Sequence, residues 1–370
     1  MFGFRVRSFS FFNSRTLIAL ATAAALSACG SDSTGPAAAP GFLGGTSDNH
    51  EIGLVVNSTG KALTLFQLGS PTTQKQIAFG ASSAITPTGL AVQGRRASVP
   101  LGNTASVALI DLTTQTVQRI FTFASGNTTG STFADDTTLI VANTDLGVVG
   151  RVTVGQSADT VSQTVKVAAQ PTAITMAGGR VAVTSANLDE NFAPIGNGVV
   201  TLLDPKTLSV LGTVTTGGTN STDAAVGPDG LLYVLNTGDF VADGSLTIVN
   251  PTTAQAVTTV TGMGVGPGAI SIDANGLAYI SGFFSGTLVW NTKTRAFVRG
   301  PDNPVCAKLA NGTCRGAFAA TTSANGTLYQ LFFGTQGLPP YAFVFKGSNF
   351  TLSDSVSVGA GPSAIAIRTF

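Results

Sequence analysis

A unit of roughly 45 residues recurs along the chain, and this period limits the possible folds more than any other feature. The clearest copies place a turn rich in glycine, aspartate or asparagine before a strongly β-forming strand, as in GPDGLLYV (227–234), DANGLAYI (273–280) and SANGTLYQ (323–330). A degenerate copy reads AGGRVAV (177–183). Asp-Gly and Asn-Gly pairs supply the positive φ angles of a tight hairpin turn. Each unit therefore opens with a two-stranded hairpin.

A second hairpin follows within each unit. Its copies read VALIDLTTQTV (107–117), VVTLLDPKTLSV (199–210), LTIVNPTT (246–253) and LVWNTKT (288–294). The aspartate or asparagine can cap the turn with its own side chain, and proline presets φ for the next position. Two hairpins give four strands per unit, which is one blade of a β-propeller.

Together with restarts of the form Pro-x-Ala-Ile at Pro171 and Pro362, these motifs resemble the YVTN-type seven-bladed β-propeller family. The resemblance covers about residues 50–370, and the copies between Asn127 and Gln170 depart most from the pattern. It implies an all-β fold of seven four-stranded blades. Because that family is functionally mixed, the resemblance implies no particular activity.

The two ends of the repeat region predict how the ring closes. The chain ends on a first strand with no blade behind it (361–367), and the repeats begin on a second strand with no first strand before it (51–57). If the C-terminal strand completes the N-terminal blade, no sheet edge is left between the last and first blades. Counting the restarts from Pro87 to Pro362 then gives seven blades.

The N-terminus has the pattern of a bacterial lipoprotein signal, which we assign to residues 1–28. Arginines precede a short apolar segment (16–26), and Leu26-Ser27-Ala28-Cys29 resembles a lipobox in which Cys29 becomes lipidated. An ordinary secretory signal with a chance cysteine is the alternative. The residues that follow, 29–49, are rich in Pro, Ala and Gly and are expected to form a flexible tether. We therefore expect a membrane anchor at the cell envelope, and Gly30 after the cysteine favours the outer membrane, if the host has one.

The two remaining cysteines, Cys306 and Cys314, are expected to form a disulfide in an oxidising compartment. A metal site there is not expected, because no histidine or further cysteine lies nearby. The net charge of +1 gives no basic footprint for nucleic acid.

The long predicted loops gather on one face of the ring, where they can form a ligand site. Its polar candidates are Asp189, Glu190, Asp239 and Asp243, with Asp302, Lys308 and Arg315 on the same side. Its aromatic candidates are Phe192, Phe240, Phe283, Phe284, Phe332, Phe333 and Tyr341. Adjacent residues in a strand point to opposite faces of the sheet. In Phe283-Phe284 and in Phe332-Phe333, the two rings therefore cannot both point toward the same side.

Three functions fit this face. A binding module for a protein, glycan or small ligand is favoured, because exposed aromatic rings mark interaction surfaces. A Ca²⁺ site could use the four carboxylates, since Ca²⁺ takes several oxygens at once, although no known calcium-loop spacing is present. A propeller-type hydrolase or lyase could use loop carboxylates, with or without a divalent cation. However, the single histidine, His50, lies at the end of the tether, and no catalytic motif appears. A purely structural component of the envelope is a further alternative. We predict no catalytic residue and no other cofactor.

Overall fold

The computed structural model describes residues 50–161, 163–335 and 337–370. The predicted signal peptide (1–28), the predicted tether (29–49) and Cys29 lie outside these residues. In the part of the chain that is described, no helix is long and apolar enough to cross a membrane.

The described residues form seven antiparallel sheets of four strands, which we number as blades I to VII. Blade I contains β28 (Pro362–Thr369), β1 (Glu51–Asn57), β2 (Ala62–Gln67) and β3 (Ser70–Ala78). Blade II contains β4 (Ala91–Gln93), β5 (Arg96–Pro100), β6 (Ser106–Asp111) and β7 (Thr116–Thr122). Blade III contains β8 (Thr128–Asp135), β9 (Thr138–Asn143), β10 (Val148–Thr153) and β11 (Gln163–Lys166).

The other four blades follow the same order from inner to outer strand. Blade IV contains β12 (Pro171–Ala177), β13 (Arg180–Ser185), β14 (Val199–Leu203) and β15 (Val210–Thr215). Blade V contains β16 (Ser221–Val226), β17 (Leu232–Asn236), β18 (Asp243–Asn250) and β19 (Gln255–Val265). Blade VI contains β20 (Pro267–Ile272), β21 (Leu277–Gly282), β22 (Gly286–Asn291) and β23 (Ala296–Arg299). Blade VII contains β24 (Ala320–Thr322), β25 (Leu328–Phe332), β26 (Tyr341–Lys346) and β27 (Thr351–Ser357).

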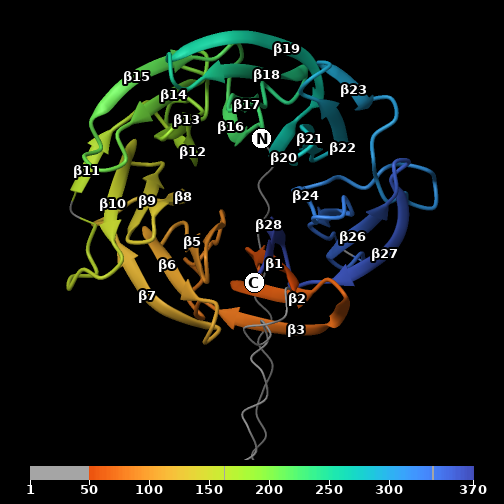
Figure 1. Cartoon of the computed structure of the whole chain (residues 1–370), viewed down its shortest axis with the longest axis horizontal. Helices are drawn as coiled ribbons and strands as arrows, with labels where there is room; N and C mark the ends of the chain where they lie inside the picture. The colour runs from red at the N-terminus through yellow and green to blue at the C-terminus, as the bar shows by residue number, and fades with distance from the viewer. Residues whose placement is uncertain (1–49, 162, 336) are drawn as a thin grey trace, which may run out of the picture. The chain divides into compact units, whose positions relative to one another are not determined.

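The blades stand around a central axis, with the first strand of each nearest the centre (Figure 1). Strand β28 closes the ring by pairing with β1 from Glu51 opposite Thr369 to Asn57 opposite Pro362. The amide of Ser58 also donates to the carbonyl of Gly361 at 2.7 Å. The predictions of seven four-stranded blades and of closure by the C-terminal strand are both confirmed.

The core lies between blades. Because side chains alternate along a strand, each sheet presents one apolar face to the blade before it and one to the blade after it. Seven buried clusters result, one for each pair of neighbouring blades. In the cluster between blades V and VI, the rings of Tyr233 and Trp290 meet edge to face at 6.2 Å. Every blade therefore depends on two neighbours for its burial.

Small residues let the inner strands approach one another closely. A Cβ at Gly130 in blade III would lie 3.1 Å from the carbonyl oxygen of Thr172 and 3.2 Å from the amide nitrogen of Ile174 in blade IV. Threonine hydroxyls join the same strands: Thr129 Oγ1 donates to the carbonyl of Pro171 at 2.8 Å, and Thr172 Oγ1 to that of Ser221 at 3.0 Å. The wall of the channel is therefore tightly packed and hydrogen bonded from blade to blade.

Candidate binding face

One face of the ring is formed by the turns between the second and third strands of each blade and by the connections from blade to blade. We call this the loop face. It includes the segments 79–90, 186–198, 237–242, 300–319 and 333–340. The described chain starts and ends on the opposite face, where the amide of Phe370 donates to the carbonyl of His50 at 3.1 Å.

Large apolar side chains are exposed on the loop face of four consecutive blades, and we call them the tip residues. The set comprises Leu146 in blade III, Phe192 and Ile195 in blade IV, Phe240 and Val241 in blade V, and Phe284 in blade VI. The most exposed are Val241 at 81%, Phe192 at 73% and Phe284 at 65%. Clustered apolar exposure of this kind marks an interaction surface.

Two of the tip residues carry backbone strain. Phe192 and Phe240 both have a φ angle of 62°, in the left-handed region. A bulky side chain in this region costs about 1–2 kcal/mol relative to glycine. Ten other non-glycine residues of the described chain also have a positive φ, five of them in turns of the opposite face, so the strain alone does not mark a binding site. The strained loops display the two rings instead of burying them.

The aspartates of these two loops hold the loops in shape. Asp189 Oδ1 accepts hydrogen bonds from the amides of Asn191 at 2.8 Å and Ala193 at 2.9 Å. Asp239 Oδ1 accepts from the amides of Val241 and Ala242, both at 2.9 Å. These backbone hydrogen bonds lower the pKa of Asp239. Both carboxylates therefore serve as loop caps that set the positions of Phe192 and Phe240.

The other two acidic candidates, Glu190 and Asp243, are exposed beside these loops. Within residues 50–161, 163–335 and 337–370, no three side chains of His, Cys, Asp or Glu come together in a group that could hold a metal ion. The four carboxylates thus lie on one face, as the sequence indicates, but they do not converge.

The aromatic candidates fall into two sets. Phe240 and Phe284 are exposed and flank the same glycine, since a Cβ at Gly266 would lie 3.1 Å and 3.0 Å from their rings. Phe283 and Phe333 are half-buried and sandwich Phe318, with ring centroids 4.9 Å and 4.6 Å from its centroid. Tyr341 is also half-buried, and its ring lies 5.7 Å from that of Phe343. In the pair Phe283-Phe284, it is therefore Phe284 that faces solvent.

Two grooves indent the loop face between blades. One, of about 490 Å³, lies between blades VII and I and is lined by Thr59, Phe333–Thr335, Gly337–Pro340 and Ala360–Gly361. The other, of about 520 Å³, lies between blades III and IV. Its lining includes Asp145, Leu146, Lys166, Glu190 and Phe192. The second groove brings an exposed ring and carboxylates together, whereas the first is lined without any charged side chain.

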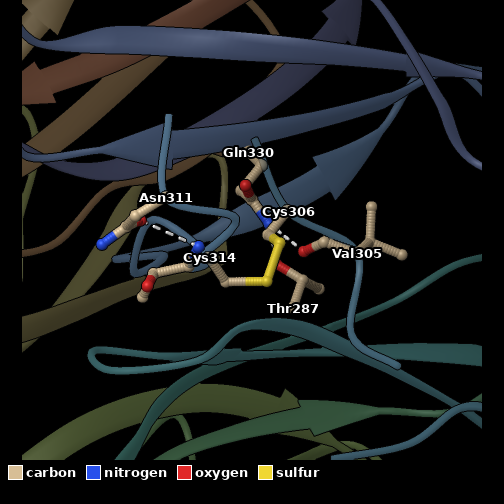
Figure 2. Close-up of a disulfide and its surroundings, with 7 residues drawn as sticks. Thr287, Val305, Cys306, Asn311, Cys314 and Gln330 are labelled. Atoms are coloured by element: carbon tan, nitrogen blue, oxygen red, sulfur yellow. Dashed lines mark hydrogen bonds between the residues drawn. A yellow bond between two sulfur atoms is a disulfide. The ribbon is translucent and has the colours of Figure 1, made fainter. Parts of the chain in front are cut away.

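A disulfide joins Cys306 to Cys314 in the connection between blades VI and VII, with the Cα atoms 5.4 Å apart (Figure 2). The loop is fixed to blade VI by two backbone hydrogen bonds between Val305 and Thr287, at 2.8 and 2.9 Å. From blade VII, Gln330 Nε2 donates to Thr287 Oγ1 and to the carbonyl of Val305, both at 2.8 Å (Figure 2). This long loop is therefore a fixed part of the face.

One further charged residue, Asp223, escaped the sequence analysis. It stands on the inner strand β16 at the position that is Ala173, Ala269 or Ala364 in other blades. Its Oδ2 accepts a hydrogen bond from the amide of Ile270 in blade VI at 2.9 Å, and its Oδ1 from the amide of Ala224 at 2.9 Å. Burial raises its pKa to about 6. The sequence does contain a signal for it: in Ser221-Thr222-Asp223-Ala224, Asp223 takes the place of the alanine in the Pro-x-Ala-Ile restart of other blades.

The ring of seven four-stranded sheets defines the chain as a seven-bladed β-propeller. No protein-family model and no curated protein matches it. Among solved structures, a chain of Kuenenia stuttgartiensis hydrazine synthase superposes with a TM-score of 0.60 at 12% sequence identity. The superposition covers 79% of this chain and 98% of that one. At this identity the likeness shows the fold alone.

Proposed function

We propose that this protein is a lipid-anchored binding module of the cell envelope, which presents its loop face to a protein partner. The observation that carries the proposal is the row of exposed tip residues on blades III to VI. Rigid scaffolds with exposed loops commonly carry binding sites. Exposed aromatic rings in particular are enriched in the cores of protein interfaces.

A protein partner fits the tips better than a glycan does. Ile195 and Val241 are 63% and 81% exposed, and aliphatic side chains offer no flat ring on which a sugar can stack. Mixed aromatic and aliphatic tips instead suit an apolar protein surface. An enzymatic role has less support, because Asp189 and Asp239 are engaged as caps of their own loops.

The proposed anchor is compatible with this role. Cys29 precedes His50 in the chain, and His50 lies on the face opposite the loop face. An anchor that leads from His50 to the membrane would turn the loop face away from the lipid. The tip residues would then be accessible to another envelope protein.

The anchor is tested by the substitution Cys29→Ala. Without the thiol that would carry the lipid, we expect the protein to move from the membrane fraction to the soluble fraction on cell fractionation. Cys306→Ser is the matched control, since it also removes a cysteine and should leave the protein at the membrane. A Cys29→Ala protein that stays in the membrane fraction would contradict the anchor.

The binding face is tested by photo-crosslinking in cells. A benzoylphenylalanine at Phe284 or Phe192 should form adducts with another protein, because both side chains project from the loop face. The same group at Lys206 or Asn275, which are exposed on the opposite face, should form none. Equal adducts from both faces, or adducts from the opposite face only, would refute the proposal.

A further inference from the structure

Charge is unevenly distributed over the loop face. In blades III to V, its turns and the adjoining strand ends carry five carboxylates and one lysine, namely Asp145, Asp189, Glu190, Asp239, Asp243 and Lys166. We call this the acidic sector. The connection between blades VI and VII carries Lys308 and Arg315 with a single aspartate, Asp302. The acidic sector is therefore a local feature and does not reflect the composition of the chain, whose net charge is +1.

Within the described residues, the acidic sector keeps an excess of negative charge. In the part of the chain that the structure describes, no ion pair involves any of the five carboxylates. The one cation of the sector, Lys166, lines the same groove as Asp145 and Glu190 and donates to the carbonyl of Leu146 at 2.8 Å, so it offsets one of the five negative charges. A surface with unpaired charge of one sign attracts partners of the opposite sign.

The acidic sector coincides with most of the tip residues. Leu146, Phe192, Ile195, Phe240 and Val241 project from the same loops that carry the carboxylates. In the groove of about 520 Å³ between blades III and IV, Asp145 and Glu190 line the same space as Leu146 and Phe192. Apolar and acidic groups thus occur together along one arc of the face, and they share a groove between blades III and IV.

Resting on the function proposed above, we infer that the segment which docks on this arc is a basic and apolar polypeptide. Its lysine or arginine side chains would face the carboxylates, and its large apolar side chains would cover the exposed rings. Charge complementarity selects this occupant, since an acidic segment would be repelled and an uncharged one would leave the carboxylates desolvated without partners.

Labelled synthetic peptides test this inference by fluorescence anisotropy against the full chain in phosphatidylcholine nanodiscs, with empty nanodiscs as the blank. The probe is KFSKFSKFSK, and the controls are EFSEFSEFSE, KSSKSSKSSK and SFSSFSSFSS. We expect the probe to bind about tenfold more tightly than any control. We also expect its affinity to fall severalfold as salt rises from about 50 to about 500 mM, because the charges are exposed and screened.

Two variants separate charge from apolar contact. D145N/E190Q/D243N removes the three carboxylates that do not cap loops, and about tenfold weaker binding is expected from three exposed charge pairs. F192N/F240N removes two rings and should weaken binding at least tenfold. Asparagine tolerates the left-handed conformation, so the thermal midpoint of this variant should not fall. The control D136N/D302N/D354N changes charge equally outside the arc and should bind within about twofold of the wild type.

The inference is overturned if EFSEFSEFSE or SFSSFSSFSS binds as tightly as the probe, if the acidic-sector variant binds unchanged, or if no peptide binds. These outcomes leave the crosslinking result intact, so they separate a wrong partner class from a wrong face. Absence of crosslinks from Phe284 and Phe192 would instead remove the proposed function and this inference together.

Discussion

Deletion of residues 362–370 is expected to abolish the native fold, or to lower the thermal midpoint by more than about 10 °C. The deletion removes β28 and leaves β1 without its partners from Glu51 to Asn57. It also removes Ile365 and Ile367 from the cluster between blades VII and I. Each buried aliphatic side chain contributes about 1.5–3 kcal/mol, and the total stability of a domain is only about 5–15 kcal/mol. Circular dichroism during thermal unfolding measures the effect.

A transposed variant is the matched control for this deletion. The carbonyl of His50 and the amide of Phe370 are 3.1 Å apart, so residues 362–370 can be moved to a place between residues 49 and 50 with a short turn. The same strand then pairs with β1 as part of a hairpin, and the thermal midpoint should return to within a few degrees of the wild type. If the deletion unfolds at the wild-type temperature, ring closure does not stabilise the fold.

Stability should fall as the pH rises through about 6, and Asp223→Ala should remove most of this dependence. Burial raises the pKa of Asp223 from 3.8 to about 6 in the folded state, so the folded protein holds this proton more tightly than the unfolded chain does. The resulting stabilisation is complete below about pH 4 and is lost as pH rises through the folded pKa. Over the whole range from about pH 4 to pH 6, the loss in the free energy of unfolding is at most about 3 kcal/mol.

The measurement is the difference in thermal midpoint between pH 5 and pH 8. About 1.4 kcal/mol of the stabilisation is lost between these pH values. For the wild type the difference in thermal midpoint should therefore exceed that of Asp223→Ala by roughly 2 °C. Alanine is a conservative replacement, because Ala173, Ala269 and Ala364 occupy the equivalent position in other blades. Asp302→Ala, an exposed loop substitution, should leave the wild-type difference unchanged. If the wild type and Asp223→Ala show the same difference between the two pH values, the raised pKa of Asp223 is contradicted.

The seven blades could be predicted from the sequence because their signals are local and repeated. The Asp-Gly and Asn-Gly turns, such as Asp229-Gly230, specify hairpins without reference to the rest of the chain. Closure could be predicted because an unpaired strand at each end has one obvious partner. Because the units can be aligned with one another, a strand assigned wrongly in one unit would disagree with the same strand in the others.

The details of the loop face could not be predicted in the same way. Whether Phe283 or Phe284 is exposed depends on Gly268, since a Cβ there would lie 2.4 Å from the ring of Phe283. The strained φ angles of Phe192 and Phe240 depend on caps from Asp189 and Asp239, which the sequence suggested as possible cation ligands. Loop conformations rest on such non-repeated contacts, and a single sequence carries no second copy with which to compare them.

The place of β1 in blade I has a mechanical consequence. It lies between β28 and β2 and is antiparallel to both. Inter-strand hydrogen bonds in antiparallel sheets run perpendicular to the strands, so tension applied along β1 at Glu51 would shear two ladders at once instead of peeling them open bond by bond. Tension on the chain ahead of His50 would therefore act along the direction in which the sheet resists separation most strongly. Strand β28, which closes the ring, would then also help to hold β1 in place against that force.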